Sequence, residues 1–533
     1  MKIIALFLVF AAAALATEAI VYEAGPLVMR SGESLKPHEQ VDALVLGRLT
    51  ELGIKPSNLC SDTAFLRRAF LAVIGTLPTE AEARGFIAAK QPDKRAQLIE
   101  VLLQRPEFTD FWAMKLGELL RVKAEFPIKL WPNAVQAYHR FIHTSVRENK
   151  PLHIFARQLL LANGSNFREG EVNFYRAMQD RSPRGIAATV ALTFMGERAD
   201  KWPEKKLDAL AGFFTQVAFK STAEWKEEIV YFDPTADKDG LTKKAIFPDG
   251  SPAAIQSGLE DPRIVFTDWL LRPENPSFCR SWSNRIWSWL MGRGIIHAPD
   301  DLRENNPPSN PELLAYLEGE LVKSKYNLKH LYRLILNSNT YQASSLLGDT
   351  KPEAHFARYP LRRLEAELII DAINKITGTT ELYTSAIPEP FTYIPQGEPA
   401  MSIGDGSITS PFLALFGRSA RATGMEEERS NKFIAPQWLH LLNSTQIQKK
   451  LESGPGLRDI INARRTPQKT LDELYLTILS RLPTSAEVEL ALSYGEPREG
   501  LNKVGKPRTG KRTEEWNDIA WALLNSSEFL FRH

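Results

Sequence analysis

The sequence contains few cysteines and no excess of one charge. Of its 533 residues only two are cysteine. The sequence has 66 basic and 64 acidic side chains, which gives a formal net charge of +2. A nucleic-acid partner is therefore not expected. Cys60 and Cys279 allow either one disulfide between the two halves or two buried free thiols, and the sequence leaves both open.

Long apolar runs are also scarce. One such run covers residues 3–16, follows Lys2 and ends in the small-x-small pattern Ala14-Leu15-Ala16. This layout predicts a secretory signal peptide over residues 1–16, because the run is too short for a membrane span. We therefore expect an exported chain, periplasmic or secreted, with no membrane span after signal cleavage.

Motifs that identify an enzyme class are missing. The chain has no Gly-x-Ser-x-Gly elbow, no Walker-type loop and no dinucleotide fingerprint. His139 and His143 are four residues apart, but no third metal ligand accompanies them, and residues 237–240 resemble only a fragment of a calcium loop. We expect no metal site and no cofactor.

A repeated pattern near both ends is the clearest positive feature. Residues 70–82 match residues 475–487, and each copy contains Leu-Pro-Thr followed by a glutamate. A second element follows each copy, at 102–108 and 523–529, with a weaker third version at 335–341. The Thr-x-x-Glu spacing predicts a capping box, so each copy is predicted to be helix, tight corner and new helix.

Helical periodicity dominates the rest of the chain. Residues 41–49, 96–103 and 311–321 are amphipathic, and the best strand candidate is 228–232. Irregular stretches rich in turn residues occupy roughly 221–258 and 387–411, and the basic run at 503–512 is predicted to be a solvated loop. We predict a mainly α fold of two helical domains with a repeated helix-corner-helix unit and irregular connecting loops.

Many short motifs resemble a known pair of domains. The first set is similar to the cytochrome-C-like second domain (PSCyt-two type) of planctomycete and verrucomicrobial exported proteins: Phe65-Leu66-Arg67-Arg68, Pro78-Thr79, Arg95, Phe108, Asn173-Phe174-Tyr175-Arg176 and Phe213-Phe214. The second set is similar to its usual C-terminal partner domain (PSD-one type): Asp261-Pro262-Arg263, Asn284-Arg285-Ile286-Trp287, Asp300-Asp301-Leu302-Arg303, Arg362-Arg363-Leu364, Phe416-Gly417-Arg418 and Glu528-Phe529.

The resemblance implies a division of the chain. After the signal peptide we expect an N-terminal arm at 17–59, a cytochrome-C-like helical domain at 60–220, an irregular connector at 221–260 and the partner domain at 261–533. Members of this family are of uncharacterised function and are often encoded near sulfatases. The resemblance therefore implies an exported partner, sulfatase-like or cytochrome-bearing.

One departure from the family concerns haem. Many members carry Cys-x-x-Cys-His after a Phe-x-Gly segment, which attaches haem covalently. Here Lys201, Glu204 and Lys205 stand at those three positions, and Met425 and Glu427 replace a second cysteine pair. Covalent haem is therefore not expected.

Carboxylates and arginines supply the remaining candidates for chemistry. Asp300 and Asp301 follow a tryptophan-rich segment that contains Trp287, and together with Glu427 and Glu428 they are candidate catalytic residues. The candidate network around them is formed by Arg285, Trp287, Arg293, Arg303, Asn306, Arg418 and Arg429. The planar guanidinium groups of these arginines suit a purely structural network equally well. In that case Glu428 and Arg429 are the residues expected to form a buried ion pair.

Two functions follow from these patterns. The first is a non-haem helical scaffold or binding protein that works with an exported partner. The second is a hydrolase that acts on polysaccharide through the carboxylate–arginine site. Carboxylates that converge in an open cleft beside tryptophans would favour the hydrolase, whereas carboxylates closed off by arginines would favour the scaffold.

Overall fold

The computed structural model describes most of the chain, namely residues 22–27, 35–237, 240–255, 260–346, 353–463, 465–495 and 511–533. Within these residues helices dominate and strands are few and short, which confirms the predicted mainly α fold. The predicted signal peptide and most of the basic run at 503–512 lie outside the described residues.

The first half of the chain contains two short strands, a run of helices and a small sheet. Its elements are β1 (Glu23–Gly25), α2 (Pro37–Glu51), β2 (Leu59–Cys60), α3 (Asp62–Val73), α4 (Glu80–Ala88), α5 (Lys94–Gln104), α6 (Pro106–Leu119), α7 (Pro132–Arg147), α8 (Leu152–Leu160), β3 (Gly164–Ser165), η1 (Gly170–Val172), α9 (Asn173–Arg176), α10 (Pro183–Val190), η2 (Ala191–Met195), η3 (Ala199–Lys201), α11 (Glu204–Ala211), β4 (Val217–Ser221), β5 (Glu228–Phe232) and η4 (Thr242–Lys244).

The second half is helical apart from one two-residue strand pair. Its elements are α12 (Pro262–Leu270), α13 (Pro276–Met291), α14 (Pro311–Lys323), α15 (Leu328–Leu336), η5 (Glu353–His355), β6 (Arg362–Arg363), α16 (Ala366–Thr377), η6 (Ala400–Ser402), α17 (Pro411–Leu415), η7 (Glu426–Glu428), α18 (Ala435–Asn443), α19 (Thr445–Ser453), α20 (Pro455–Asn462), α21 (Pro467–Leu479), α22 (Ser485–Ser493), α23 (Thr513–Leu524), α24 (Ser527–Leu530) and β7 (Phe531–Arg532).

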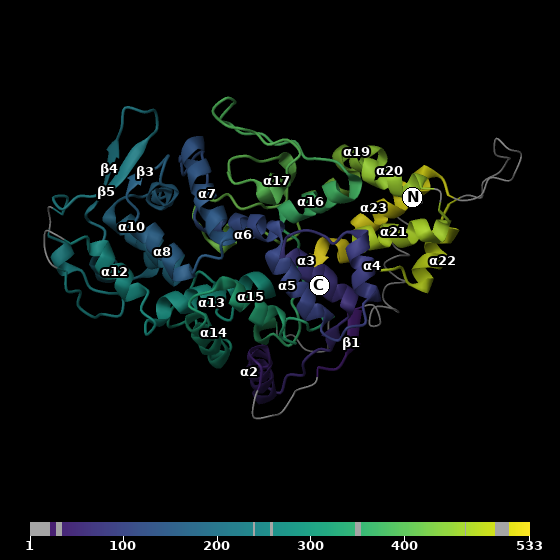
Figure 1. The fold of residues 1–533 in the computed structure, drawn as a ribbon, viewed down its shortest axis with the longest axis horizontal. Coiled ribbons are helices and arrows are strands. Elements are labelled where there is room, and N and C mark those ends of the chain that lie inside the picture. Colours follow the sequence, from purple (N-terminus) through teal and green to yellow (C-terminus); the bar gives the residue numbers. More distant parts are fainter. Residues whose placement is uncertain are drawn as a thin grey trace, which may run out of the picture.

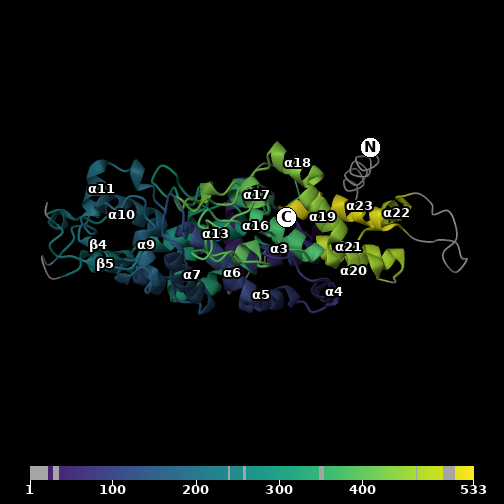
Figure 2. The same cartoon turned by 90° about the horizontal axis from the view of Figure 1, so that it is seen from above.

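The segment predicted as the best strand candidate does form a strand. Residues 228–232 form β5, the centre of an antiparallel sheet in the order β3-β5-β4, with Val230 opposite both Gly164 and Phe219. This sheet and α10–α12 form one end of an elongated molecule, and α20–α22 form the other end (Figures 1 and 2).

Both predicted capping boxes are present. The Thr79 hydroxyl accepts from the Glu82 amide at 3.2 Å, and the Glu82 carboxylate accepts from the Thr79 amide at 2.8 Å. Thr484 and Glu487 repeat the arrangement at 3.3 and 2.7 Å. Each box satisfies two backbone donors at the start of a helix, which explains why the Leu-Pro-Thr corner begins a new helix in both copies.

The two copies of the repeat pack against each other. The Arg67 guanidinium of α3 donates to the carbonyl of Ile478 in α21 at 2.8 Å and to that of Phe529 at 3.0 Å. Neighbouring Arg68 donates to the His533 carbonyl at 2.8 Å. In Figure 1, α3 and α4 accordingly lie beside α21, although some 400 residues separate them in sequence.

One hydrophobic core runs through both halves of the chain. It includes Phe65 and Phe70 of α3, Trp282 and Trp287 of α13, and Leu474 of α21, each almost fully buried. The segments predicted as two domains therefore bury their apolar side chains together. No helix in the described residues is both long and apolar enough to cross a membrane.

The two cysteines are not bridged. Cys60 and Cys279 are both buried free thiols, which decides between the two alternatives that the sequence left open. Burial, with Glu318 nearby, raises the pKa of the Cys279 thiol to about 12. Such a thiol remains protonated and unreactive at neutral pH.

Candidate functional site

The predicted catalytic carboxylates come from two loops that the fold brings together. Asp300 and Asp301 follow α13, while Glu427 and Glu428 belong to η7. The two segments meet where the backbone amide of Glu426 donates to Asp300 Oδ2 at 2.6 Å. The sequence analysis therefore grouped two segments that do meet in the structure, although they are 126 residues apart.

Asp300 is closed off from solvent. Its side chain is 1 % exposed and pairs with Arg285, which is 2 % exposed, at 2.8 Å. Arg285 also donates to the Leu192 carbonyl at 3.3 Å. With one oxygen on Arg285 and the other on the Glu426 amide, Asp300 joins three segments of the core and does not face a ligand.

Asp301 and Glu427 are also held by cations. Arg303 donates to Asp301 at 2.8 Å, and Lys201 lies 3.8 Å from the same carboxylate. Arg198 pairs with Glu427 at 3.1 Å. These ion pairs are partly exposed, and they leave the predicted carboxylates paired with arginines rather than converging in an open cleft.

The predicted ion pair at the end of η7 needs correction. Glu428 accepts from the backbone amides of Ala422 at 3.1 Å and Thr423 at 2.7 Å, and it does not pair with Arg429. Arg429 instead bonds both oxygens of Glu367 in α16, at 2.7 and 2.9 Å, and also contacts Glu118 in α6. The buried partners of Arg429 lie in distant helices, and local spacing does not indicate them.

Glu367 is the centre of this buried charge cluster. Burial opposes its ionisation, but Arg429 and Arg418 outweigh burial and lower the pKa of Glu367 to about 2. One turn further along α16, burial raises the pKa of Asp371 to about 7, and the amides of Ala400 and Met401 offset this only in part. Like-charged Glu367 adds to the shift of Asp371.

The other predicted network residues have structural partners. Trp287 is fully buried and packs edge-on against Phe356 at 5.0 Å. Asn306 donates to the carbonyls of His297 at 3.1 Å and Asp301 at 2.8 Å, which fixes the loop after α13. Arg293 lies close enough to His297 to contribute to lowering its pKa, after burial.

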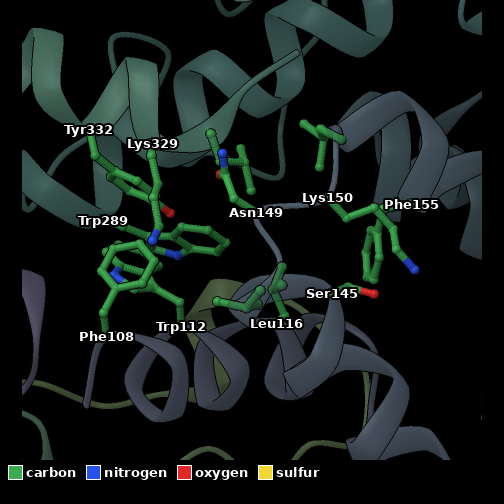
Figure 3. Close-up of a pocket in the computed structure, with 13 residues that line it drawn as sticks. Phe108, Trp112, Leu116, Ser145, Asn149, Lys150, Phe155, Trp289, Lys329 and Tyr332 are labelled. Atoms are coloured by element: carbon green, nitrogen blue, oxygen red, sulfur yellow. The ribbon is translucent and has the colours of Figure 1, made fainter. Parts of the chain in front are cut away.

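An aromatic pocket lies beside the predicted site. Figure 3 shows four of its aromatic side chains grouped around Lys329, with Phe155 on the opposite side: Phe108, Trp112, Trp289 and Tyr332. Trp289 connects it to η7 by donating to Glu426 at 3.2 Å. The free space in the pocket is only about 30 Å³, far below the roughly 300 Å³ at which small-molecule sites begin, so the side chains nearly fill it.

A larger groove lies between α7 and the α16–α17 loop (residues 378–410), near the top of Figure 1. Its free volume is about 480 Å³, within the range of small-molecule sites. One face of α7 forms one wall, through residues spaced as i, i+3, i+4 and i+7: Pro132, Val135, Gln136 and His139. The loop forms the other wall with Thr392, Tyr393, Pro395, Glu398, Ser402, Ile403, Gly404, Asp405 and Ile408.

The loop is held firmly at its base. The Asp405 carboxylate accepts from the amides of Ala124 at 3.0 Å and Ser407 at 2.8 Å. Glu125 accepts from the Ser385 hydroxyl at 2.9 Å and from the Ala386 amide at 2.7 Å. The groove wall is therefore anchored to the segment just before α7.

Gly404 lets the loop approach α7 closely. A Cβ atom at Gly404 would lie 2.5 Å from the His139 ring, so any other residue would push the wall away. Burial, followed by Arg421 and His143, lowers the pKa of His139 to about 4, and its imidazole is neutral at pH 7. His143, the other histidine of the predicted pair, bonds Asp110 at 3.0 Å.

Comparison with known families covers both halves of the chain. Residues 40–207 match a family described as a protein of unknown function, DUF1549 or PSCyt2. Residues 262–494 match a second, described as a protein of unknown function, DUF1553 or PSD1, in the order that the sequence motifs predict. The chain thus contains a region similar to each of these two families, in this order. No curated protein and no solved structure matches it.

The groove lies between the two matched regions. Helix α7 belongs to the PSCyt2 region and the α16–α17 loop to the PSD1 region. The sequence analysis did not identify this groove. Two features of the sequence correspond to its walls: the irregular stretch at 387–411 and the helical spacing of the lining residues on α7. Neither feature shows that the two segments meet.

The PSCyt2 region does not fit covalent haem in this chain. The three positions that resemble the attachment motif hold Lys201, Glu204 and Lys205, none of which forms a thioether. Lys201 faces Asp301 instead, and Arg198 just before it pairs with Glu427 of the PSD1 region. The segments around Lys201 and Glu427 thus meet through ion pairs.

Proposed function

We propose that this protein is a non-haem helical binding protein whose ligand site is the groove between α7 and the α16–α17 loop. The observation that carries the proposal is an open groove of about 480 Å³ that is lined by both family regions. A groove of this volume has room for a ligand, and Gln136, His139 and Ser402 offer it polar groups.

Binding is favoured over hydrolysis because the carboxylates predicted as catalytic are held by arginines or backbone amides. Glycoside hydrolysis uses two carboxyl groups on either side of the scissile bond. In the groove Glu398 is exposed, but Asp405 is buried and holds two backbone amides. At the site predicted from sequence, Asp300 is sealed against Arg285.

The proposal includes the exported compartment, periplasmic or secreted, and an exported partner. The apolar segment at residues 3–16 supports export. The resemblance to proteins encoded near sulfatases supports a sulfatase-like or cytochrome-bearing partner.

A ligand screen by thermal shift tests the proposal. The full chain is heated with oligosaccharides, nucleotides, amino acids, fatty acids and short peptides, and each ligand that raises Tm is recovered and analysed. We expect at least one class of ligand to raise Tm and to be recovered chemically unchanged. The same ligand should no longer raise the Tm of the Gln136→Ala variant. Conversion of the ligand, or no shift with any class, would contradict the proposal.

A further inference from the structure

We propose that the groove between α7 and the α16–α17 loop binds a neutral carbohydrate chain. This inference rests on the proposed binding function and names the class of ligand. Three properties of the groove support it: exposed aromatic faces, uncharged polar groups, and an absence of cations among its described lining residues.

The aromatic faces are unusually open. Tyr393 is 67 % exposed and Phe391 is 55 % exposed, and Phe391 leans on Trp131 with 5.7 Å between ring centroids. Trp131 directly precedes α7, so these rings line the approach to the groove. One face of a pyranose ring is made of C–H groups, and such a face stacks on an aromatic ring and buries apolar area.

The polar groups are neutral and able to bond hydroxyls. His139 is uncharged at pH 7 and therefore offers one donor and one acceptor. The amide of Gln136 and the hydroxyl of Ser402 lie on opposite walls of the groove, and among described residues neither side chain has a hydrogen-bond partner. Together these groups match a ligand that has many hydroxyl groups.

The charge pattern selects against anionic glycans. The described lining residues include the carboxylates Glu398 and Asp405 and no lysine or arginine. Two arginines bond backbone carbonyls of the loop wall without being lining residues themselves: Arg421 donates to the Gly404 carbonyl at 2.5 Å, and Arg418 donates to the Ile408 carbonyl. A sulfated or uronic-acid chain would therefore meet the exposed Glu398 carboxylate with no lysine or arginine in the described lining.

Calorimetric titration of the full chain tests this inference. The probes are cellohexaose, xylohexaose, mannohexaose and maltohexaose, with a sulfated carrageenan hexasaccharide and a leucine- and phenylalanine-rich decapeptide as comparators. We expect at least one neutral hexasaccharide to bind, and Tyr393→Ala and Gln136→Ala each to weaken that binding about tenfold.

Trp225→Ala is the matched control. Trp225 is 71 % exposed on the loop between β4 and β5, so its removal deletes an exposed aromatic side chain far from the groove. This variant should bind the sugar as the parent chain does. All three substitutions are at exposed side chains, so their melting temperatures should stay within about 2 °C of the parent.

Other outcomes overturn the inference. The inference is wrong if none of the four neutral sugars binds, or if the carrageenan fragment binds more tightly than they do. It is also wrong if Tyr393→Ala leaves sugar binding unchanged. Binding of the decapeptide in place of the sugars, weakened by Gln136→Ala, would reject a carbohydrate ligand and leave the proposed binding function standing.

Discussion

Ser480 occupies a backbone position that the first repeat fills with glycine. Its φ is 63°, and that of the equivalent Gly75 is 66°, so both end a helix in the left-handed region. Glycine adopts this conformation freely, whereas serine does so at a cost. The Ser480 hydroxyl is also buried without a partner.

Replacing Ser480 with glycine should therefore stabilise the protein. We expect Ser480→Gly to raise the free energy of unfolding by about 1 kcal/mol, measured by urea denaturation. Gly75→Ala is the converse test and should destabilise, because its Cβ would lie 2.7 Å from the Phe111 ring. A loss of stability in Ser480→Gly would show that the position does not favour glycine.

Asp371 makes stability depend on pH in a defined direction. Its pKa is about 7 in the folded protein and 3.8 ordinarily, so between these values the folded state keeps a proton that the unfolded chain has lost. The contribution of Asp371 is therefore present at low pH and declines as pH rises from 3.8 to 7, by up to about 1.4 kcal/mol per pH unit.

Asp371→Asn removes this titration. Urea denaturation of both proteins at pH 4.5, 6 and 7.5 should show the stability of the parent falling relative to the variant as pH rises. Above pH 7 the difference should become constant. Parallel curves across the whole range would mean that Asp371 ionises as freely in the folded state as in the unfolded chain.

The elements that could be predicted from the sequence are those whose ends depend on residues close together in the chain. The two capping boxes and the start of α14, where the Asn310 side chain accepts from the Leu313 amide at 3.0 Å, depend on residues three apart. The α16–α17 loop was not predictable beyond its irregularity, because its anchors on Ala124 and Glu125 lie some 260 to 280 residues away.

The same distinction applies to the candidate site. Sequence proximity correctly grouped Asp300 with Arg285 and Asp301 with Arg303. It failed for Arg429, whose partners Glu118 and Glu367 come from other helices. It also missed the groove, whose walls belong to different regions of the chain.

The anchoring of the loop gives an element-scale prediction. Glu125 accepts two hydrogen bonds from the loop, so Glu125→Ala should increase amide hydrogen exchange at residues 384–409. Exchange in the helices of the core should stay the same. Glu148→Ala is the control, because Glu148 is exposed at the end of α7 and pairs only weakly with Arg147, at 3.7 Å. Equal exchange in both variants would show that Glu125 does not hold the loop.

At the scale of the whole molecule, the two family regions share one core. Arg67 and Arg68 of the PSCyt2 region bond carbonyls of residues 478, 529 and 533, and Lys115 pairs with Glu365 of the PSD1 region at 3.2 Å. Some buried charges of each region therefore have their partners in the other.

Unfolding should consequently occur in one step. We expect a single transition for the full chain in scanning calorimetry, with the calorimetric and van't Hoff enthalpies in agreement. Two resolved transitions, one for each family region, would contradict the shared core.

The contact of α3 with α21 and β7 also determines when folding can finish. During synthesis the N-terminal part of the chain is made first. The carbonyls that Arg67 and Arg68 bond follow 411 to 465 residues later. Contacts so distant in sequence slow folding and leave apolar helices uncovered in the meantime. The apolar side chains of α3 in a nascent chain of this protein therefore stay partly uncovered until the last helices are made.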